Sequence, residues 1–111
     1  MKDLTTFQRK CEAELLRLLK RKHLVLENRK LGGQKEIYIY AEVKGLETWI
    51  YEDGAEIAGD TVDKRFEKYD FDSDDELINA FIGELESLID STRKFGATIR
   101  NSRGRENRGR S

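Results

Sequence analysis

The chain has 111 residues, of which 37% are hydrophobic and 39% charged, so it is long enough for one domain with a modest core. It contains no apolar run long enough to cross a membrane, and its polar start, MKDLTTFQRK, is not typical of a secretory signal. The single cysteine, Cys11, excludes an internal disulfide and fits a reducing compartment. We therefore expect a cytoplasmic protein that makes no membrane contact.

The net charge of -1 conceals a strong segregation of charge along the chain. Residues 1–35 carry +6, residues 36–92 carry -13 and residues 93–111 carry +6. This asymmetry has two interpretations. It indicates electrostatic contact with a partner, or the basic and acidic parts neutralise each other within the fold.

Residues 4–22 have the pattern of an amphipathic helix. Apolar residues recur at steps of three and four, and lysine and arginine predominate on the more polar side. The apolar stripe consists of Leu4, Phe7, Cys11, Leu15, Leu18 and Leu19. Either Asp3 or Thr5 is a suitable N-cap. In this interpretation Cys11 is a core residue rather than a reactive thiol.

Residues 23–58 fit a meander of four antiparallel strands. Three pairs that end in glycine, at 32–33, 44–45 and 53–54, suit two-residue hairpin loops because those turns need positive φ. Counting outward from these loops sorts the side chains onto two chemically distinct faces. The aliphatic face contains Leu26, Ile39, Ile50 and Ile57 as mutual partners. The second face contains the row Val25, Tyr40, Trp49 and Ala58 and the row Glu27, Tyr38, Tyr51 and Glu56. A slip of one residue would mix the faces, so the sorting favours this register, which also places Arg29 opposite Glu36.

The segment 61–72 shows no regular pattern, although Phe66, Tyr69 and Phe71 are expected to anchor it against the core. Ser73 and Glu76 then form the signature of a capping box at the start of a second helix. Its apolar residues are Leu77, Ile78, Phe81, Ile82, Leu85, Leu88 and Ile89. We expect this helix to stop near Gly96. Beyond it the chain is rich in arginine, glycine and serine, a composition typical of disorder.

These elements predict an α+β fold of helix, four-stranded antiparallel meander and helix (α-β-β-β-β-α), with the helices mainly on one face of the sheet. Residues 1–95 would form a single domain and residues 96–111 a disordered tail. The aliphatic face would take both helices. The aromatic face would then be open unless the second helix covers it.

An open aromatic face indicates an interaction surface, because large exposed aromatic patches are costly and Tyr and Trp are enriched at binding sites. Acidic residues near this face favour a partner with a basic surface. We therefore predict a small non-enzymatic domain without a cofactor or metal, which binds another protein or a second copy of itself. In type it resembles bacterial immunity proteins and phage inhibitors. The predicted contact residues are Tyr38, Tyr40, Trp49, Tyr51, Glu42, Glu47, Glu52 and Glu56.

A second interpretation is nucleic-acid binding through residues 4–22 and the C-terminal tail. The tail repeats an Arg-Gly-Arg spacing that suits contact with phosphates without sequence preference. Its arginines are Arg100, Arg103, Arg105, Arg108 and Arg110.

A third interpretation comes from Glu42-Val43-Lys44, an E-x-K at the end of an apolar strand. It resembles the active-site strand of the PD-(D/E)xK nuclease superfamily, in which carboxylates hold Mg²⁺. The resemblance implies that Glu12 or Glu14 supplies the acid from a helix. The Asp that this family carries at the end of the preceding strand is missing here, where the chain has Glu27 and Asn28.

Overall fold

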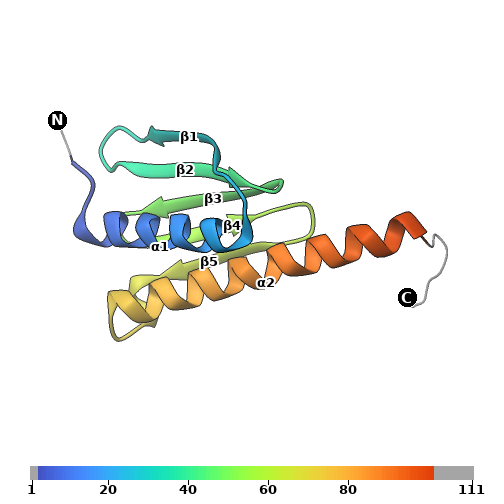
Figure 1. Cartoon of the computed structure of the whole chain (residues 1–111). Helices are drawn as coiled ribbons and strands as arrows, with labels where there is room; N and C mark the ends of the chain where they lie inside the picture. The colour runs from blue at the N-terminus through green and yellow to red at the C-terminus, as the bar shows by residue number, and fades with distance from the viewer. Residues whose placement is uncertain (1–2, 102–111) are drawn as a thin grey trace.

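The computed structural model describes the backbone of residues 3–101 and the side chains of residues 3–91. Helix α1 (Thr6–Lys22) is followed by five strands, a short 3₁₀ helix η1 (Lys68–Asp70) and helix α2 (Asp74–Asn101). The strands are β1 (Glu27–Gly32), β2 (Tyr38–Val43), β3 (Leu46–Tyr51), β4 (Gly54–Ala58) and β5 (Asp63–Glu67). They form one antiparallel sheet in sequence order, and both helices lie side by side on one of its faces (Figure 1). The α+β class is confirmed, but the sheet has five strands rather than four.

Helix α1 begins and ends where its capping residues allow. Thr5 and Gln8 form a capping box, in which the Thr5 side chain accepts a hydrogen bond from the Gln8 N–H and the Gln8 side chain accepts one from the Thr5 N–H. His23 is the C-cap after the last helical residue, with a left-handed φ of 59°, and its backbone N–H donates to the carbonyls of Leu19 and Lys20. The Thr5 cap and the predicted apolar stripe are confirmed, and Gln8 is buried beside that stripe.

The central hairpin has the predicted register. Ile39 pairs with Ile50, and Tyr40 pairs with Trp49, around the turn formed by Lys44 and Gly45. Both turn residues have positive φ, 50° and 81°, as a two-residue hairpin loop requires.

The other two predicted turns are wrong. The β3–β4 loop is Glu52-Asp53, so Ile50 pairs with Ala55 rather than Ile57, and Trp49 pairs with Glu56 rather than Ala58. Gly54 is the first residue of β4, and only glycine fits there because a side chain would collide with the Phe66 carbonyl of β5. A displacement of two residues preserves the faces, so Ile57 remains buried and Glu56 still faces outward.

The first hairpin differs more. Its loop spans residues 33–37, so Leu31 pairs with Ile39 and Lys30 with Tyr40, where Leu26 and Val25 were predicted. The expected Arg29–Glu36 pair is therefore wrong. Asn28, at a φ of 54°, lies in a bulge between Glu27 and Lys30. Gly32 is the last residue of β1, and glycine is required there because the ring of Tyr38 occupies the space that a side chain would need.

Strand β5 was not predicted, because Asp63, Lys64, Arg65 and Glu67 give it a charged composition. Charged residues are typical of an edge strand, where they oppose pairing with other chains. Phe66 packs against the core, with its ring edge-on to Phe81 at 6.0 Å between centroids. Phe71 also packs there, but Tyr69 is 83% exposed, so its predicted anchoring role is wrong.

Helix α2 begins at the predicted N-cap, where the Ser73 hydroxyl accepts a hydrogen bond from the Glu76 N–H at 3.2 Å. The reciprocal half of the predicted capping box differs, because the Glu76 side chain accepts from the Asp72 N–H instead of the Ser73 N–H. It passes through Gly96 and ends at Asn101, so the predicted stop is wrong. A glycine costs only about 1 kcal/mol in a helix interior and does not terminate the helix by itself. Residues 102–111, which contain most of the predicted tail, lie outside the described part of the chain. Neither described helix is both long and apolar enough to cross a membrane.

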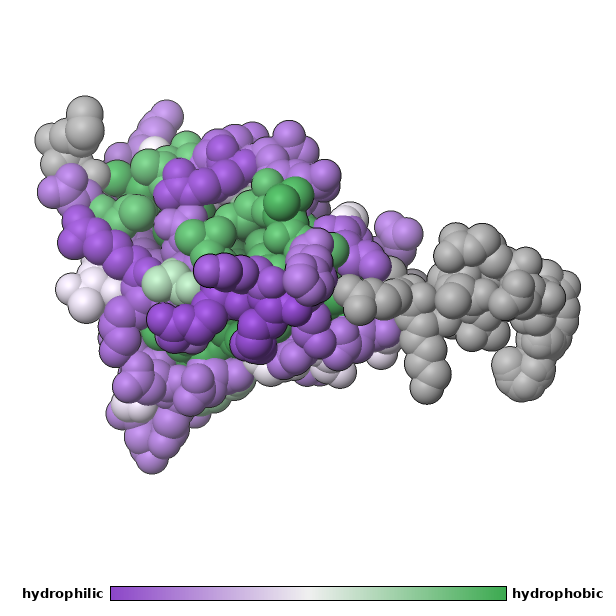
Figure 2. Space-filling view, viewed as in Figure 1, coloured by the Kyte–Doolittle hydropathy of each residue, from purple (hydrophilic) through white to green (hydrophobic). Residues whose placement is uncertain are grey.

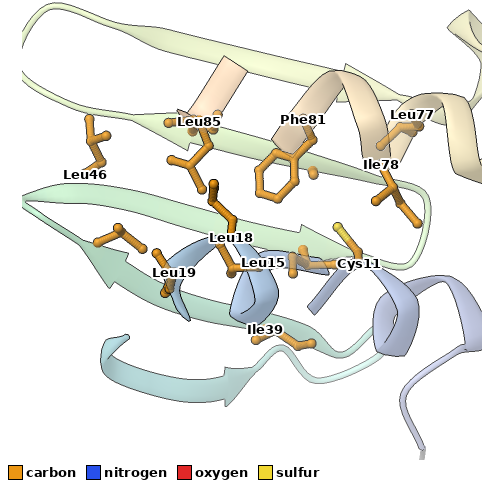
Figure 3. Close-up of a cluster of buried hydrophobic side chains, with 14 of the residues drawn as sticks. Cys11, Leu15, Leu18, Leu19, Ile39, Leu46, Leu77, Ile78, Phe81 and Leu85 are labelled. Carbon is orange, nitrogen blue, oxygen red and sulfur yellow. The ribbon is translucent and has the colours of Figure 1, made fainter. Parts of the chain in front are cut away.

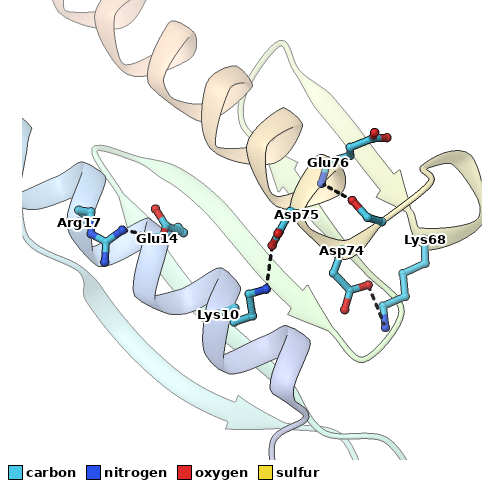
Figure 4. Close-up of polar contacts among 8 residues, drawn as sticks. Lys10, Glu14, Arg17, Lys68, Asp74, Asp75 and Glu76 are labelled. Carbon is cyan, nitrogen blue, oxygen red and sulfur yellow. Dashed lines mark hydrogen bonds and ion pairs between the residues drawn. The ribbon is translucent and has the colours of Figure 1, made fainter.

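The core lies between the sheet and the two helices (Figure 3). Ion pairs join α1 to α2 along the rim of this core: Lys10 with Asp75 at 2.8 Å, and Lys22 with Glu86 and Asp90, each at 3.1 Å (Figure 4 shows the first of these). Part of the charge segregation is therefore neutralised within the fold.

Gly83 provides a test of the α2 assignment. It is exposed in the middle of the helix, and nothing lies within 4 Å of the position that a Cβ would take. We expect Gly83→Ala to raise the free energy of unfolding by about 0.5–1 kcal/mol, because alanine loses less backbone entropy in a helix. Thermal unfolding followed by circular dichroism measures the change. Gly54→Ala is the contrasting variant and should destabilise the domain; a loss of stability in Gly83→Ala would contradict the exposed helical setting.

Candidate binding surface

The candidate site is the open face of the sheet, defined as the side turned away from α1 and α2. Strands β2 and β3 place four aromatic side chains on this face: Tyr38, Tyr40, Trp49 and Tyr51. Tyr38 packs edge-on against Tyr51, with 5.8 Å between ring centroids, and Tyr40 packs edge-on against Trp49 at 5.4 Å. Within residues 3–101, no helix or strand lies across this face (Figure 1).

Two cations from the edge strands border the aromatic rings. The Lys30 ammonium of β1 lies 5.2 Å from the centroid of the Tyr40 ring, and the Arg65 guanidinium carbon of β5 lies 4.6 Å from that of Tyr51. Both are within the range of cation–π attraction. Sequence reasoning missed both, because it misplaced β1 and did not find β5. The alternation of Arg65 with inward-facing Phe66 is the signal that could have found the second.

A row of carboxylates crosses one end of the open face. Glu27 pairs with Glu42, and Glu42 pairs with Glu47, so three acids lie on neighbouring strands. The Tyr40 hydroxyl lies 2.6 Å from a carboxylate oxygen of Glu42 and 2.8 Å from one of Glu47. A phenol has one proton to donate, so it serves one of these carboxylates at a time. Carboxylates directly opposite each other on neighbouring strands repel. A cation bound at this end of the sheet would reduce that repulsion.

Hydrogen bonds shift the titration of these groups in opposite directions. The Tyr40 hydroxyl and the Asn28 amide hold the pKa of Glu42 below its usual range, because both donate to the ionised carboxylate. The same bond to Glu42, together with burial, raises the pKa of Tyr40. Burial, and then the hydrogen bond to Glu56 at 2.9 Å, raise the pKa of Tyr51 to about 12. Tyr40 and Tyr51 therefore stay protonated, and the Glu42 carboxylate stays ionised, at neutral pH.

The structure brings together seven of the eight predicted contact residues. Glu42, Glu47 and Glu56 lie among the four rings on the open face, whereas Glu52 lies in the β3–β4 turn and accepts a hydrogen bond from the Ile37 N–H at 3.3 Å. The side chains of the tail arginines are not described. Arg100 falls within α2, and the rest lie outside the described residues: Arg103, Arg105, Arg108 and Arg110.

The residues implied by the nuclease resemblance do not converge. Glu42 is on the open face, whereas Glu12 of α1 accepts two hydrogen bonds from Arg29, and Glu14 pairs with Arg17 at 2.7 Å. Lys44 lies in the hairpin turn. Among the described residues, no three His, Cys, Asp or Glu side chains form a group that could hold a metal ion. Cys11 is fully buried, and burial raises the pKa of its thiol to about 12, which fits the predicted core role.

The side of the molecule that bears the helices is mainly hydrophilic, with apolar side chains gathered beside α1 and its connection to β1 (Figure 2). Leu16, Val25 and Leu31 are the exposed members, at 48%, 73% and 51%. A pocket of about 370 Å³ lies at the end of the sheet, between the β2–β3 turn and the β4–β5 connection. Its apolar lining comes from Leu46, Val62 and Leu88. Neither feature contains the predicted contact residues of the open face, although Lys44 of the E-x-K motif lines the pocket.

The fold and this surface define a small α+β domain whose five-stranded antiparallel sheet carries helices on one face and aromatic side chains on the other. No protein-family model matches the chain, and comparisons with curated proteins and with solved structures found no match.

Proposed function

We propose that this domain is a non-enzymatic binding module that recognises a protein partner with a basic surface through the open face of its sheet. The observation that carries the proposal is the run of four aromatic rings on a face that no described element covers. Aromatic side chains provide large, rigid contact area and are the residues that most often dominate binding energy. Tyr40 is only 9% exposed and the other three rings are half-buried, so the aromatic area that a partner would cover comes from Tyr38, Trp49 and Tyr51.

The charges around the rings favour a protein over a nucleic acid. Glu42, Glu47 and Glu56 would repel phosphates and attract a basic surface, which speeds association. Nucleic-acid binding through α1 and the arginine-rich segment has less support. Several α1 cations already pair with acids of α2, including Lys10 with Asp75 and Lys22 with Glu86.

The proposal is tested by photo-crosslinking in cells. The photoreactive residue p-benzoylphenylalanine replaces Tyr38 on the open face in one variant and Ala13, an exposed residue of α1, in the matched control. We expect a discrete crosslinked protein only from the Tyr38 variant. Equal crosslinking from both positions, or none from either, would contradict a site on the open face. A product of twice the chain mass would identify a second copy as the partner.

With the captured partner purified, Trp49→Ala should weaken binding by about 2 kcal/mol or more, which is roughly thirtyfold. Circular dichroism must show that Trp49→Ala still folds. Leu16→Ala, which removes an exposed leucine from the helix side, is the control and should leave affinity unchanged.

Glu47→Lys should slow association with the partner and reduce the dependence of the association rate on salt. Binding that instead disappears on deletion of residues 102–111, and falls steeply with salt, would favour nucleic-acid or phosphate recognition.

A further inference from the structure

The open face contains two groups in which a cation lies over an aromatic ring beside a carboxylate. In the first, Arg65 lies over Tyr51, with Glu56 at 3.6 Å and Glu67 at 2.6 Å from the guanidinium. In the second, Lys30 lies over Tyr40, whose hydroxyl contacts Glu42. The face is therefore already built to hold cations against its rings.

Trp49 lies between these two groups. Like them it has carboxylates beside an aromatic ring, but no described cation lies over its ring. Tyr40 and Glu56 are its partners on the neighbouring strands, and Glu47 precedes it by two residues on the same face. The described cation–π contacts involve Tyr40, Tyr51 and Phe7, and none involves Trp49 within the described residues. An indole is the aromatic group that attracts cations most strongly.

Glu47 is the carboxylate best placed to bind an incoming cation beside Trp49. It is exposed, and its one described contact is with the Tyr40 hydroxyl, which also contacts Glu42 at the shorter distance of 2.6 Å. Glu42 has an additional donor in Asn28, whereas no ion pair to Glu47 occurs among residues 3–91. Glu47 therefore retains most of its capacity to accept hydrogen bonds.

We propose that the open face recognises an arginine side chain of the protein partner, which stacks on Trp49 and donates hydrogen bonds to Glu47. This inference rests on the proposed function and specifies the chemistry of its partner. Arginine fits better than lysine because its planar guanidinium both stacks on a ring and presents paired donors to a carboxylate. Arg65 on Tyr51 shows the same arrangement within the chain.

The test uses the full chain labelled with ¹⁵N, in which the indole N–H of the single tryptophan reports on this position alone. The probes are the matched peptides GRGRGRG and GKGKGKG, titrated at equal, low ionic strength. We expect the arginine peptide to shift the Trp49 signal saturably and to bind roughly two- to fivefold more tightly than the lysine peptide, the size of one exposed cation–π contact. Glu47→Gln should abolish this preference. Asp70→Asn, which removes one exposed charge at the end of η1, should preserve it.

Equal affinity for the two peptides, or an unmoved Trp49 signal, would overturn the inference. So would a saturable shift with a ten-residue oligothymidylate in place of the arginine peptide, since that would assign the ring to a nucleobase. A change in the Trp49 signal when residues 102–111 are deleted, with no peptide present, would show that the chain's own arginines fill the position. Failure with the peptides alongside specific crosslinking at Tyr38 would reject only this inference, whereas failure of both would also reject the proposed function.

Discussion

Replacing Phe81 by alanine is expected to lower the free energy of unfolding by about 3–5 kcal/mol. Phe81 is fully buried on α2, where it faces the sheet (Figure 3), and its ring packs edge-on against that of Phe66 in β5. The substitution removes the ring that links α2 to the edge strand and leaves a cavity that the surrounding side chains can only partly fill. A domain of this size has about 5–15 kcal/mol of stability in total, so the loss would be a large share of it.

Urea denaturation, followed by circular dichroism and by Trp49 fluorescence, measures this loss. Tyr69→Ala is the matched control, because it removes an aromatic ring that is 83% exposed and should change stability by less than about 0.5 kcal/mol. A loss below about 1 kcal/mol in Phe81→Ala would show that the ring is not packed as described. If Phe81→Ala does not fold at all, Phe81→Leu should still fold with a smaller loss.

Replacing Gln8 by leucine is expected to cost about 2–4 kcal/mol, even though leucine is the more hydrophobic residue. Gln8 is completely buried, and its side-chain amide donates to the Ile37 carbonyl at 2.6 Å and to the Ile50 carbonyl at 3.2 Å. Leucine would leave both carbonyls without this donor and would remove the acceptor for the Thr5 N–H. Because Ile37 and Ile50 directly precede Tyr38 and Tyr51, Gln8 also positions two strands of the open face.

The same urea experiment tests this prediction, with Gln34→Leu in the exposed β1–β2 loop as the matched control. Gln34→Leu should leave stability within about 0.5 kcal/mol of the parent. Equal stability of the two variants would mean that the Gln8 amide contributes nothing to the fold. A nuclear magnetic resonance spectrum of Gln8→Leu should also show altered signals for Tyr38 and Tyr51, whereas Gln34→Leu should not alter them.

Several features of this protein follow from the sequence alone because they depend on neighbouring residues. The apolar stripes of both helices, and the caps at Thr5 and Ser73, are local patterns, and the structure confirms them. The hairpin around Lys44-Gly45 is predictable because its loop has only two residues, and the strands before and after it alternate between mainly aliphatic side chains and aromatic or acidic ones. These elements place Tyr38, Tyr40, Trp49 and Tyr51 on one face without any knowledge of the fold.

The tertiary structure alone decided the edges of the sheet. Strands β1 and β5 are the two edge strands, so each has a strand neighbour on one side only. Their composition is charged, and they show little hydrophobic alternation. The register of β1 includes a bulge at Asn28, and Arg29 of this strand bonds Glu12 of α1. Neither feature can be found by counting outward from Gly32-Gly33. Lys30 and Arg65 reach the aromatic rings only through these edge strands, and Gln8 finds its carbonyl partners 29 and 42 residues along the chain. Local patterns act over one turn or one hairpin, whereas these contacts form only when the helices and the whole sheet pack together.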